Sequence, residues 1–441
     1  MDDLRERLRR LQRAYSVTRG SGQGADAAGG VPGSKAASIR EQLERMERRG
    51  SRGLGAEVGF SKESRPLRLE EVLRGREVAT PQGPCYELKA AYSSTYRHGE
   101  HCIGAFRDTD LKTLNLFCGG GDGSEIRADE VLFMDLETTG LSLGTGTYVF
   151  LIGLGWFREG QYHVHQVFLR DFDEEPAALY HTRQLMEPFR TLVTFNGKRF
   201  DIPLLDARFT MCSQPETLRD MTSWDLLYPA RRLWYDRLEN CRLGTIERDR
   251  LGVVREGLDI AGDQIPGLYF DYVHDGDARE MDRIVYHNAM DVLTLTTLAV
   301  HIDRSLEEKD PVRSNLFSVG RYYERKGIQG LGEEYFEVVS SRGSAPREKD
   351  RALLHLARQR KREGRIEDAL RIWHELIEGE GYGTVDGCVE MAKHLEHRTR
   401  DYDEAIKVVL NALVRVRPGE ARLRGDLEKR LERLNRKKGR A

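Results

Sequence analysis

The sequence lacks the cysteine spacing of small metal-binding and disulfide-rich domains. Its 441 residues include six cysteines, and no two of them form a Cys-x-x-Cys pair. This spacing argues against a zinc finger and against a framework of disulfide bonds. Scattered cysteines fit a reducing compartment, so we expect a cytoplasmic protein. Zinc remains an alternative only for one segment, which contains Cys85, His98, His101 and Cys102.

Long apolar runs and a net charge are also missing. No run approaches the ~20 apolar residues of a membrane-spanning helix, and no hydrophobic signal-peptide core follows the charged N-terminus. The formal net charge is −2, because 70 lysines and arginines nearly balance 72 aspartates and glutamates. A nucleic-acid partner would therefore have to bind at a local patch, since the chain has no overall basic field.

The chain does contain a pair of carboxylates at the end of an apolar strand. Residues 131–140 read VLFMDLETTG, with Asp135 and Glu137 two positions apart before a Thr-Thr-Gly turn. Side chains alternate along a strand, so both carboxylates point to the same face. Like charges side by side repel unless a cation lies between them, and Mg²⁺ prefers carboxylate oxygens. The alternative is a polar strand end that runs into a turn.

Further strands and helices follow this pair in an order typical of an α/β fold. Asp201, a third carboxylate, stands where a strand gives way to a helix. The order of elements predicts a mixed sheet with flanking helices. The expected elements are a hairpin at 147–169, a helix at 174–190, a strand at 191–196, a helix that starts near Asp201, a helix at 224–235 and a last helix at 279–306.

The last predicted helix carries the fourth carboxylate, Asp291. His287 lies one helical turn before it and shares its face, whereas Tyr286 lies well round the helix. A single histidine on a helix is more often a structural residue than a catalytic one. Its pairing with an aspartate, in a chain with three other suitable carboxylates, favours a catalytic role.

These motifs together resemble a known family. Asp-x-Glu on a first strand, Asn-x-x-x-Phe-Asp at a strand-to-helix junction, and His or Tyr before Asp on a closing helix resemble the DEDD (DnaQ-like) 3′-to-5′ exonucleases, which share the ribonuclease H-like fold. The run DLETTGLSLGTGTYVFLIG and the later DLL at 225–227 are similar to the YprB-like group of bacterial ribonuclease H-like proteins. The resemblance covers residues 81–306.

The resemblance implies a metal-dependent nuclease that hydrolyses phosphodiester bonds of DNA or RNA from the 3′ end. Two ions, Mg²⁺ or Mn²⁺, would be held by four carboxylates: Asp135, Glu137, Asp201 and Asp291. Two such ions stabilise charge on the entering and leaving oxygens of a phosphodiester. The residues implied to contact substrate are Asn196, Lys198, Phe200 and Tyr286.

The water-orienting residue is open between two neighbours. The resemblance assigns this role to His287, which would deprotonate the attacking water. The familiar subclasses, however, place Tyr four residues or His five residues before the last Asp. Here His287 stands four residues before Asp291 and Tyr286 stands five before it. If Tyr286 faces the ions, the role passes to it.

The C-terminal third is predicted to be helical and repetitive. Ala357 and Ala369 recur as Ala392 and Ala405, an offset close to the ~34-residue tetratricopeptide period. This region resembles a short tetratricopeptide array, which would offer a surface to a protein partner. The alternative is a plain helical domain that packs on the α/β part.

We therefore expect four segments and weigh three functions. The segments are 1–65 with charged helices and a linker, 66–130 as a small β-containing lead-in, 131–310 as the ribonuclease H-like domain, and 311–441 as the tetratricopeptide-like domain with a basic tail. A nuclease is the preferred function. The alternatives are a nucleic-acid-binding module with little catalysis and an adaptor that acts through the C-terminal helices, and no membrane partner is expected.

Overall fold

The computed structural model describes residues 65–120, 125–140, 146–215, 218–255, 257, 259–342, 345–379 and 381–440. The charged helices and linker expected before Arg65 lie outside these residues. The chain divides into two compact units: the first runs to Pro229 and includes Arg242–Asp303, and the second combines Ala230–Cys241 with the chain from Arg304. The four segments proposed from the sequence stay a prediction. In the described part, no helix is long and apolar enough to cross a membrane.

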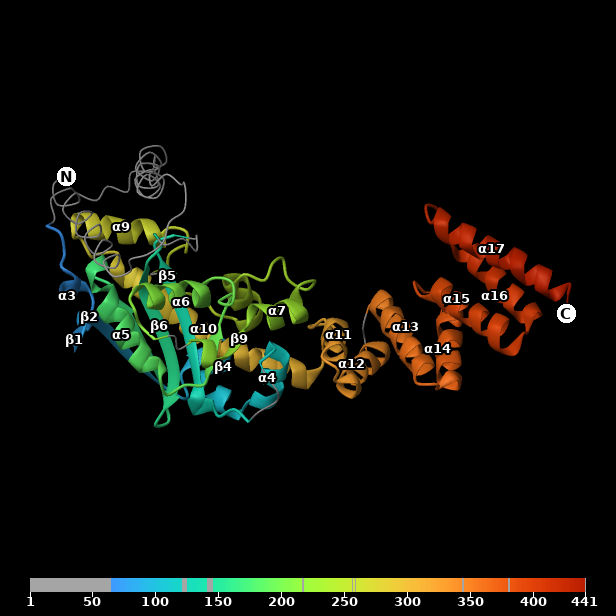
Figure 1. The fold of residues 1–441 in the computed structure, drawn as a ribbon, viewed down its shortest axis with the longest axis horizontal. Coiled ribbons are helices and arrows are strands. Elements are labelled where there is room, and N and C mark those ends of the chain that lie inside the picture. The colour runs from blue at the N-terminus through green and yellow to red at the C-terminus, as the bar shows by residue number, and fades with distance from the viewer. Residues whose placement is uncertain are drawn as a thin grey trace, which may run out of the picture. The chain divides into compact units, whose positions relative to one another are not determined.

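A mixed sheet lies at the centre of the first unit (Figure 1). Across the described residues its order is β1-β2-β7-β6-β5-β8-β9. β8 runs parallel to β5 and β9, and the other neighbours are antiparallel. The mixed sheet expected from the sequence is confirmed. Its strands are β1 (Arg76–Thr80), β2 (Gly83–Ser93), β5 (Val131–Thr138), β6 (Val149–Arg158), β7 (Gln161–Phe168), β8 (Thr191–Thr194) and β9 (Thr222–Asp225).

The segment before the carboxylate strand contributes to this same sheet. β1 and β2 come from residues 66–130 and extend the sheet beyond β7. The same segment also forms a separate hairpin of β3 (Arg97–His98) and β4 (His101–Cys102). The seven-stranded sheet of the described residues is thus assembled from both sides of the boundary expected near residue 130.

β6 is apolar along its whole length because both of its faces are covered. Its residues from Val149 to Phe157 are all buried, and only Arg158 at the end is exposed. A central strand covered on both faces needs no polar alternation. Glu159 and Gly160 both have positive φ, at 51° and 80°, as a tight two-residue hairpin turn into β7 requires. The hairpin expected from the sequence is confirmed.

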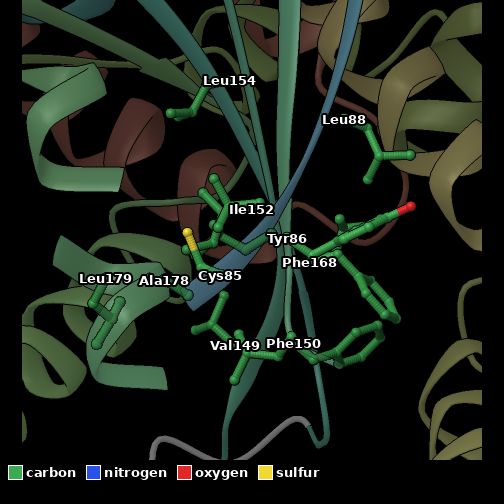
Figure 2. Packing of buried hydrophobic residues seen from close by; sticks show 14 of the residues in the cluster. Cys85, Tyr86, Leu88, Val149, Phe150, Ile152, Leu154, Phe168, Ala178 and Leu179 are labelled. Atoms are coloured by element: carbon green, nitrogen blue, oxygen red, sulfur yellow. The ribbon is translucent and has the colours of Figure 1, made fainter. Parts of the chain in front are cut away.

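Helices cover the two faces of the sheet. On one face, α5 places His181 3.1 Å from Glu87 of β2, and α6 is joined to α5 by the Arg208–Glu175 ion pair. On the other face, the Tyr269 ring of α9 stacks on Phe150 at 3.9 Å between centroids. Figure 2 shows apolar side chains of this core, with Ala178 and Leu179 of α5 on the same side as Cys85. Among the described residues up to Glu308, the helices are α3 (Leu69–Val72), α4 (Leu111–Cys118), α5 (Glu175–Met186), α6 (Asp201–Met211), α7 (Leu227–Trp234), α8 (Leu243–Ile246), α9 (Ile265–Asp275) and α10 (Met281–Glu308).

One sequence-based prediction in this part is wrong. We expected a helix over 224–235, but Trp224 and Asp225 end strand β9 and the helix α7 begins at Leu227. β9 has four residues and pairs in parallel with β8. A strand this short shows no period of its own in the sequence, so its partner decides its conformation.

The second unit is helical in all of its described elements, as expected. Consecutive helices pack on one another, and the alanines at their contacts, including Ala357, Ala369, Ala392 and Ala405, are fully buried. Small side chains at these positions let helices approach closely. The helices are α11 (Leu316–Arg325), α12 (Gln329–Ser341), α13 (Pro346–Arg362), α14 (Ile366–Glu378), α15 (Thr384–His394), α16 (Tyr402–Arg415) and α17 (Ala421–Lys438), with one π-helical turn, η6 (Leu395–Thr399), after α15.

A buried carboxylate attaches α17 to the rest of this unit. Glu396 of η6 accepts hydrogen bonds from Arg430 at 2.7 Å, from Arg433 at 2.7 and 2.9 Å, and from Lys437 at 2.8 Å. Arg433 is the main reason that the pKa of Glu396 is lowered to about 2, and Lys437 adds to the effect although burial opposes it. The basic segment that we expected as a C-terminal tail therefore includes three residues that bind Glu396: Arg430, Arg433 and Lys437.

We predict that Glu396→Gln lowers the free energy of unfolding of the second unit by about 1–2 kcal/mol, since a shift of one pKa unit corresponds to ~1.4 kcal/mol and partly exposed partners are screened. The folded pKa lies below the ~4.3 of an unfolded glutamate, so this stabilisation is present above about pH 4.3 and is lost as the pH falls toward 2. Hydrogen exchange of the α17 amides, measured by mass spectrometry from pH 7 downward, checks both statements.

The matched control is Glu404→Gln on α16. Glu404 pairs with Lys407 at 2.9 Å on an exposed surface, so its loss should change exchange very little. Equal α17 exchange in Glu396→Gln and the wild type at pH 7 would contradict the proposed role of Glu396.

Candidate functional site

Asp135 and Glu137 lie on one face of β5, as the alternation of strand side chains predicts. In the register with β6, Asp135 lies opposite Gly153 and Glu137 opposite Leu151. β5 lies between β6 and β8 in the sheet, and both carboxylates are half-buried. The strand therefore holds two acidic groups side by side, largely out of water.

Asp201 reaches the site from the turn that follows β8. Asn196 has a left-handed backbone with φ of 65°, and Asp225 at the end of β9 accepts hydrogen bonds from the backbone N–H of Asn196 at 2.7 Å and of Lys198 at 3.1 Å. The buried Asp225 thus fixes the turn, and α6 then begins at Asp201. Lys198 and Phe200, two predicted substrate contacts, are exposed, and Phe200 retains 42% of its accessible surface.

Asp291 and His287 come from α10, one helical turn apart. His287 Nε2 is 3.6 Å from Asp291 Oδ2, and His287 Nδ1 is 2.7 Å from Asp259 Oδ1. Tyr286 contributes, after burial and Tyr96, to raising the pKa of Tyr92 on β2 to about 12. Of the two neighbouring candidates, His287 is the one in contact with Asp291.

The carboxylates lie close enough to one another to shift their ionisation. Burial, followed by the charges of Asp291, Glu137 and Asp201, raises the pKa of Asp135 well above its usual value. Burial and the charges of Asp291 and Asp201 likewise raise the pKa of Glu137. Burial and the nearby Asp225 raise the pKa of Asp201 to about 7. The structure thus brings all four sequence-predicted carboxylates into one electrostatic cluster.

Asn288, which sequence reasoning missed, holds Asp135 in place. Its Nδ2 donates to the Asp135 carbonyl oxygen at 3.1 Å and to Asp135 Oδ2 at 2.8 Å, while its Oδ1 accepts from Gln166 Nε2 at 2.8 Å. Asn288 is fully buried. Gly153 makes this possible, since a β-carbon there would lie 2.2 Å from Asn288 Oδ1. The signal in the sequence was the position of Asn288 between His287 and Asp291.

Arg255 is the second residue that sequence reasoning missed. Its guanidinium donates to both oxygens of Glu247, at 2.5 and 2.9 Å, to Asp259 at 3.2 Å, and to Asp291 Oδ1. Although burial favours its neutral form, these carboxylates raise the pKa of Arg255, which stays charged. Arg255 lies outside any motif, so only its contacts identify it.

Asp259 completes the surroundings of His287. Burial alone would raise the pKa of Asp259, but the hydrogen bond with His287 and the charge of Arg255 lower it below its usual range. A carboxylate paired with one imidazole nitrogen fixes the orientation and tautomer of the ring. The other nitrogen of His287, Nε2, is then directed to Asp291.

The donors of the cluster suit a hard divalent cation. Carboxylate oxygens are the ligands that Mg²⁺ and Mn²⁺ take in proteins. In the described residues, however, no group of three or more His, Cys, Asp or Glu side chains has the arrangement of a formed metal site. Asp135 Oδ2 and Asp291 Oδ1 are hydrogen-bonded to Asn288 and Arg255 instead. The carboxylate oxygens of the site nevertheless match such ions in their chemistry.

The zinc alternative for the segment around His98 is not supported. His98 Nε2 lies 2.7 Å from Thr294 Oγ1, and His101 Nε2 lies 2.9 Å from His301 Nδ1. Cys85 is buried in the apolar core of the sheet. These histidines attach the β3–β4 hairpin to α10, and within the described residues they form no metal-binding group.

Comparisons with known proteins agree with this architecture. Residues 132–303 match the family model of the RNase_H superfamily, which confirms the ribonuclease H-like fold expected for the α/β part. The chain is also 28% identical over 350 residues to the uncharacterized protein YprB of Bacillus subtilis (strain 168), an alignment that covers 75% of this chain and 80% of that protein. Both findings support a ribonuclease H-like family, and a domain of this superfamily suggests nuclease activity on nucleic acids.

We predict that Gly153→Ala lowers the free energy of unfolding by about 1–3 kcal/mol, the usual cost of inserting a methyl group into a filled space. The added carbon displaces Asn288 and so disturbs its bonds to Asp135. Urea denaturation measures the loss. Gly267→Ala on α9 is the control, because its β-carbon would meet nothing within 4 Å and alanine favours a helix. A Gly153→Ala protein as stable as the control would contradict the packing described here.

Proposed function

We propose that the protein is a metal-dependent nuclease, most similar in its chemistry to the DEDD-type 3′-to-5′ exonucleases, acting on DNA or RNA in the cytoplasm. The observation that carries the proposal is the cluster of four half-buried carboxylates, in which burial and then the charges of Asp291 and Asp201 raise the pKa of both Asp135 and Glu137. Keeping so many like charges together out of water is unfavourable unless a cation joins them. A site for divalent ions gives this arrangement a physical purpose.

In this proposal Asp135, Glu137, Asp201 and Asp291 hold two ions, Mg²⁺ or Mn²⁺. When bound, such ions supply positive charge to the entering and leaving oxygens of the phosphodiester. His287 acts as the general base through Nε2, which receives the proton of the attacking water. Asp259 accepts a hydrogen bond from Nδ1 of His287, at 2.7 Å, and so keeps Nε2 free for that proton.

The exposed residues of the Asn196–Asp201 turn are proposed to receive the nucleic acid. Phe200 presents an accessible ring on which a base can stack. Lys198 is exposed on the same turn and can bind a phosphate. Asn196 has the left-handed backbone conformation in this same turn, which leads into α6 at Asp201.

A second function is favoured by two observations. The carboxylates do not form a complete metal-binding group in the described residues, and the second unit consists of stacked helices with buried alanines. An adaptor with weak or no catalysis, which binds nucleic acid or a protein partner through tetratricopeptide-like helices, would have both features. The two functions differ in whether the purified protein cuts nucleic acid.

We predict that the purified protein shortens 5′-labelled single-stranded DNA or RNA stepwise in Mg²⁺ or Mn²⁺. Gel electrophoresis should show a ladder of products that is lost with a chelator and in Asp135→Asn, which keeps the shape of the side chain but removes its charge. Cleavage that persists in Asp135→Asn would exclude this site. No cleavage of either polymer in either metal would instead favour the adaptor.

A further prediction separates the two candidates for the water-orienting role. His287→Ala should lower the rate of cleavage by ~100-fold or more, the usual contribution of a general base. Tyr286→Phe should cost much less, because His287 is the residue whose Nε2 lies 3.6 Å from Asp291 Oδ2. Single-turnover cleavage rates at saturating protein measure this difference. The opposite order of the two effects would transfer the role to Tyr286.

A further inference from the structure

The guanidinium of Arg255 lies where four acidic or basic groups of the site meet. It donates to Glu247, Asp259 and Asp291, and its Nη1 is 3.2 Å from His287 Nδ1. Only 11% of the side chain is exposed. A buried positive charge therefore already contacts Asp291, one of the four carboxylates proposed to bind divalent ions.

Several contacts hold Arg255 in this position. Both oxygens of Glu247 accept from it, a geometry that fixes a guanidinium firmly. Glu247 is itself buried at the start of the π-helical turn η5 (Glu247–Leu251), and Thr294 of α10 donates to its Oε1 at 2.5 Å. Arg255 is thus bound to two elements at once and is part of the folded site rather than a mobile surface residue.

This arrangement affects the ions that the site can take. Asp291 Oδ1 accepts a hydrogen bond from the guanidinium of Arg255. An ion that binds this oxygen would therefore have to share it with Arg255 or displace the guanidinium. The charge of Arg255 also reaches the second carboxylate of β5, because it partly offsets the burial of Glu137. In the protein without metal, Arg255 therefore relieves part of the repulsion that a divalent ion would otherwise relieve.

We infer that Arg255 is the resident cation of the site, and that a divalent ion on the Asp291 side binds in competition with it. The inference rests on the proposed function, since it concerns the same carboxylates. It assigns Arg255 as a positioning residue that keeps Asp291 and His287 in place and limits how tightly metal binds before nucleic acid arrives. It also gives a physical reason why the carboxylates do not surround a metal position in the described residues.

The test is a titration of the full-length protein with Mn²⁺, followed by the electron paramagnetic resonance signal of the free ion. Arg255→Gln removes one positive charge and leaves Glu247 and Asp259 without their counter-charge. Mn²⁺ affinity should therefore rise on the order of tenfold, from the loss of one nearby unit charge in a half-buried site. Arg255→Lys keeps the charge and should bind Mn²⁺ much as the wild type does.

Two further variants determine whether charge is the cause. Glu247→Gln leaves Arg255 with more uncompensated charge and should weaken Mn²⁺ binding, while the double variant Arg255→Gln with Glu247→Gln should return close to wild type. Circular dichroism and melting temperature establish that each variant is folded. A folded Arg255→Gln protein that binds Mn²⁺ no more tightly than the wild type overturns the inference.

The outcomes also separate this inference from the proposed function. If the wild type binds Mn²⁺ and Asp135→Asn does not, the proposed metal site is supported, whatever the Mn²⁺ affinity of Arg255→Gln. If the wild type binds no Mn²⁺ but Arg255→Gln does, the inference about Arg255 is supported, and the charge of Arg255 prevents Mn²⁺ from binding to the wild type. If neither protein binds Mn²⁺, both the metal site and the competition at Asp291 are wrong.

Discussion

The site depends on one electrostatic constraint, the need to balance several carboxylates gathered out of water. Asp135 and Glu137 come from β5, Asp201 from the start of α6, and Asp291 from α10. Their mutual repulsion opposes folding, and the protein offsets it with specific partners rather than with solvent. Asn288 donates to Asp135, and Arg255 to Asp291. The groups around the carboxylates are therefore as much part of the site as the carboxylates themselves.

Close approach of α10 to the sheet makes this gathering possible. Gly153 and Gly155 on β6 have no side chain where Asn288 and Val292 of α10 come nearest, and a β-carbon would lie 2.2 and 2.5 Å from their atoms. Since β6 is paired with β5, the helix that fits over these glycines also brings Asp291 to the carboxylates of β5. The glycines of the apolar run thus serve packing and the site at the same time.

The second unit uses different means to hold its helices together. Buried alanines allow close contacts, and the single carboxylate of Glu396 binds three cations of α17. A buried charge of this kind is stable only while its partners are present. In the first unit the balance is reversed, because a single guanidinium, that of Arg255, contacts three carboxylates, those of Glu247, Asp259 and Asp291.

The sequence by itself determined the features that depend on neighbouring residues. Strand alternation placed Asp135 and Glu137 on one face, and helical spacing placed His287 beside Asp291. The apolar run that ends at the turn of Glu159 and Gly160 predicted a hairpin. It failed at β9, where four residues take their conformation from a parallel neighbour. Local periodicity carries such information only where an element is long enough to repeat.

Only the tertiary structure decided which groups surround the carboxylates. Asn288 and Asp135 are 153 residues apart in the chain, His287 and Asp259 are 28 apart, and Arg255 and Asp291 are 36 apart. Asn288 lies within a motif and Arg255 in none, yet neither partner could be read from spacing. Hydrogen bonds and charge pairs between distant segments depend on how the helices pack on the sheet, and packing is set by the whole fold rather than by any one stretch of sequence.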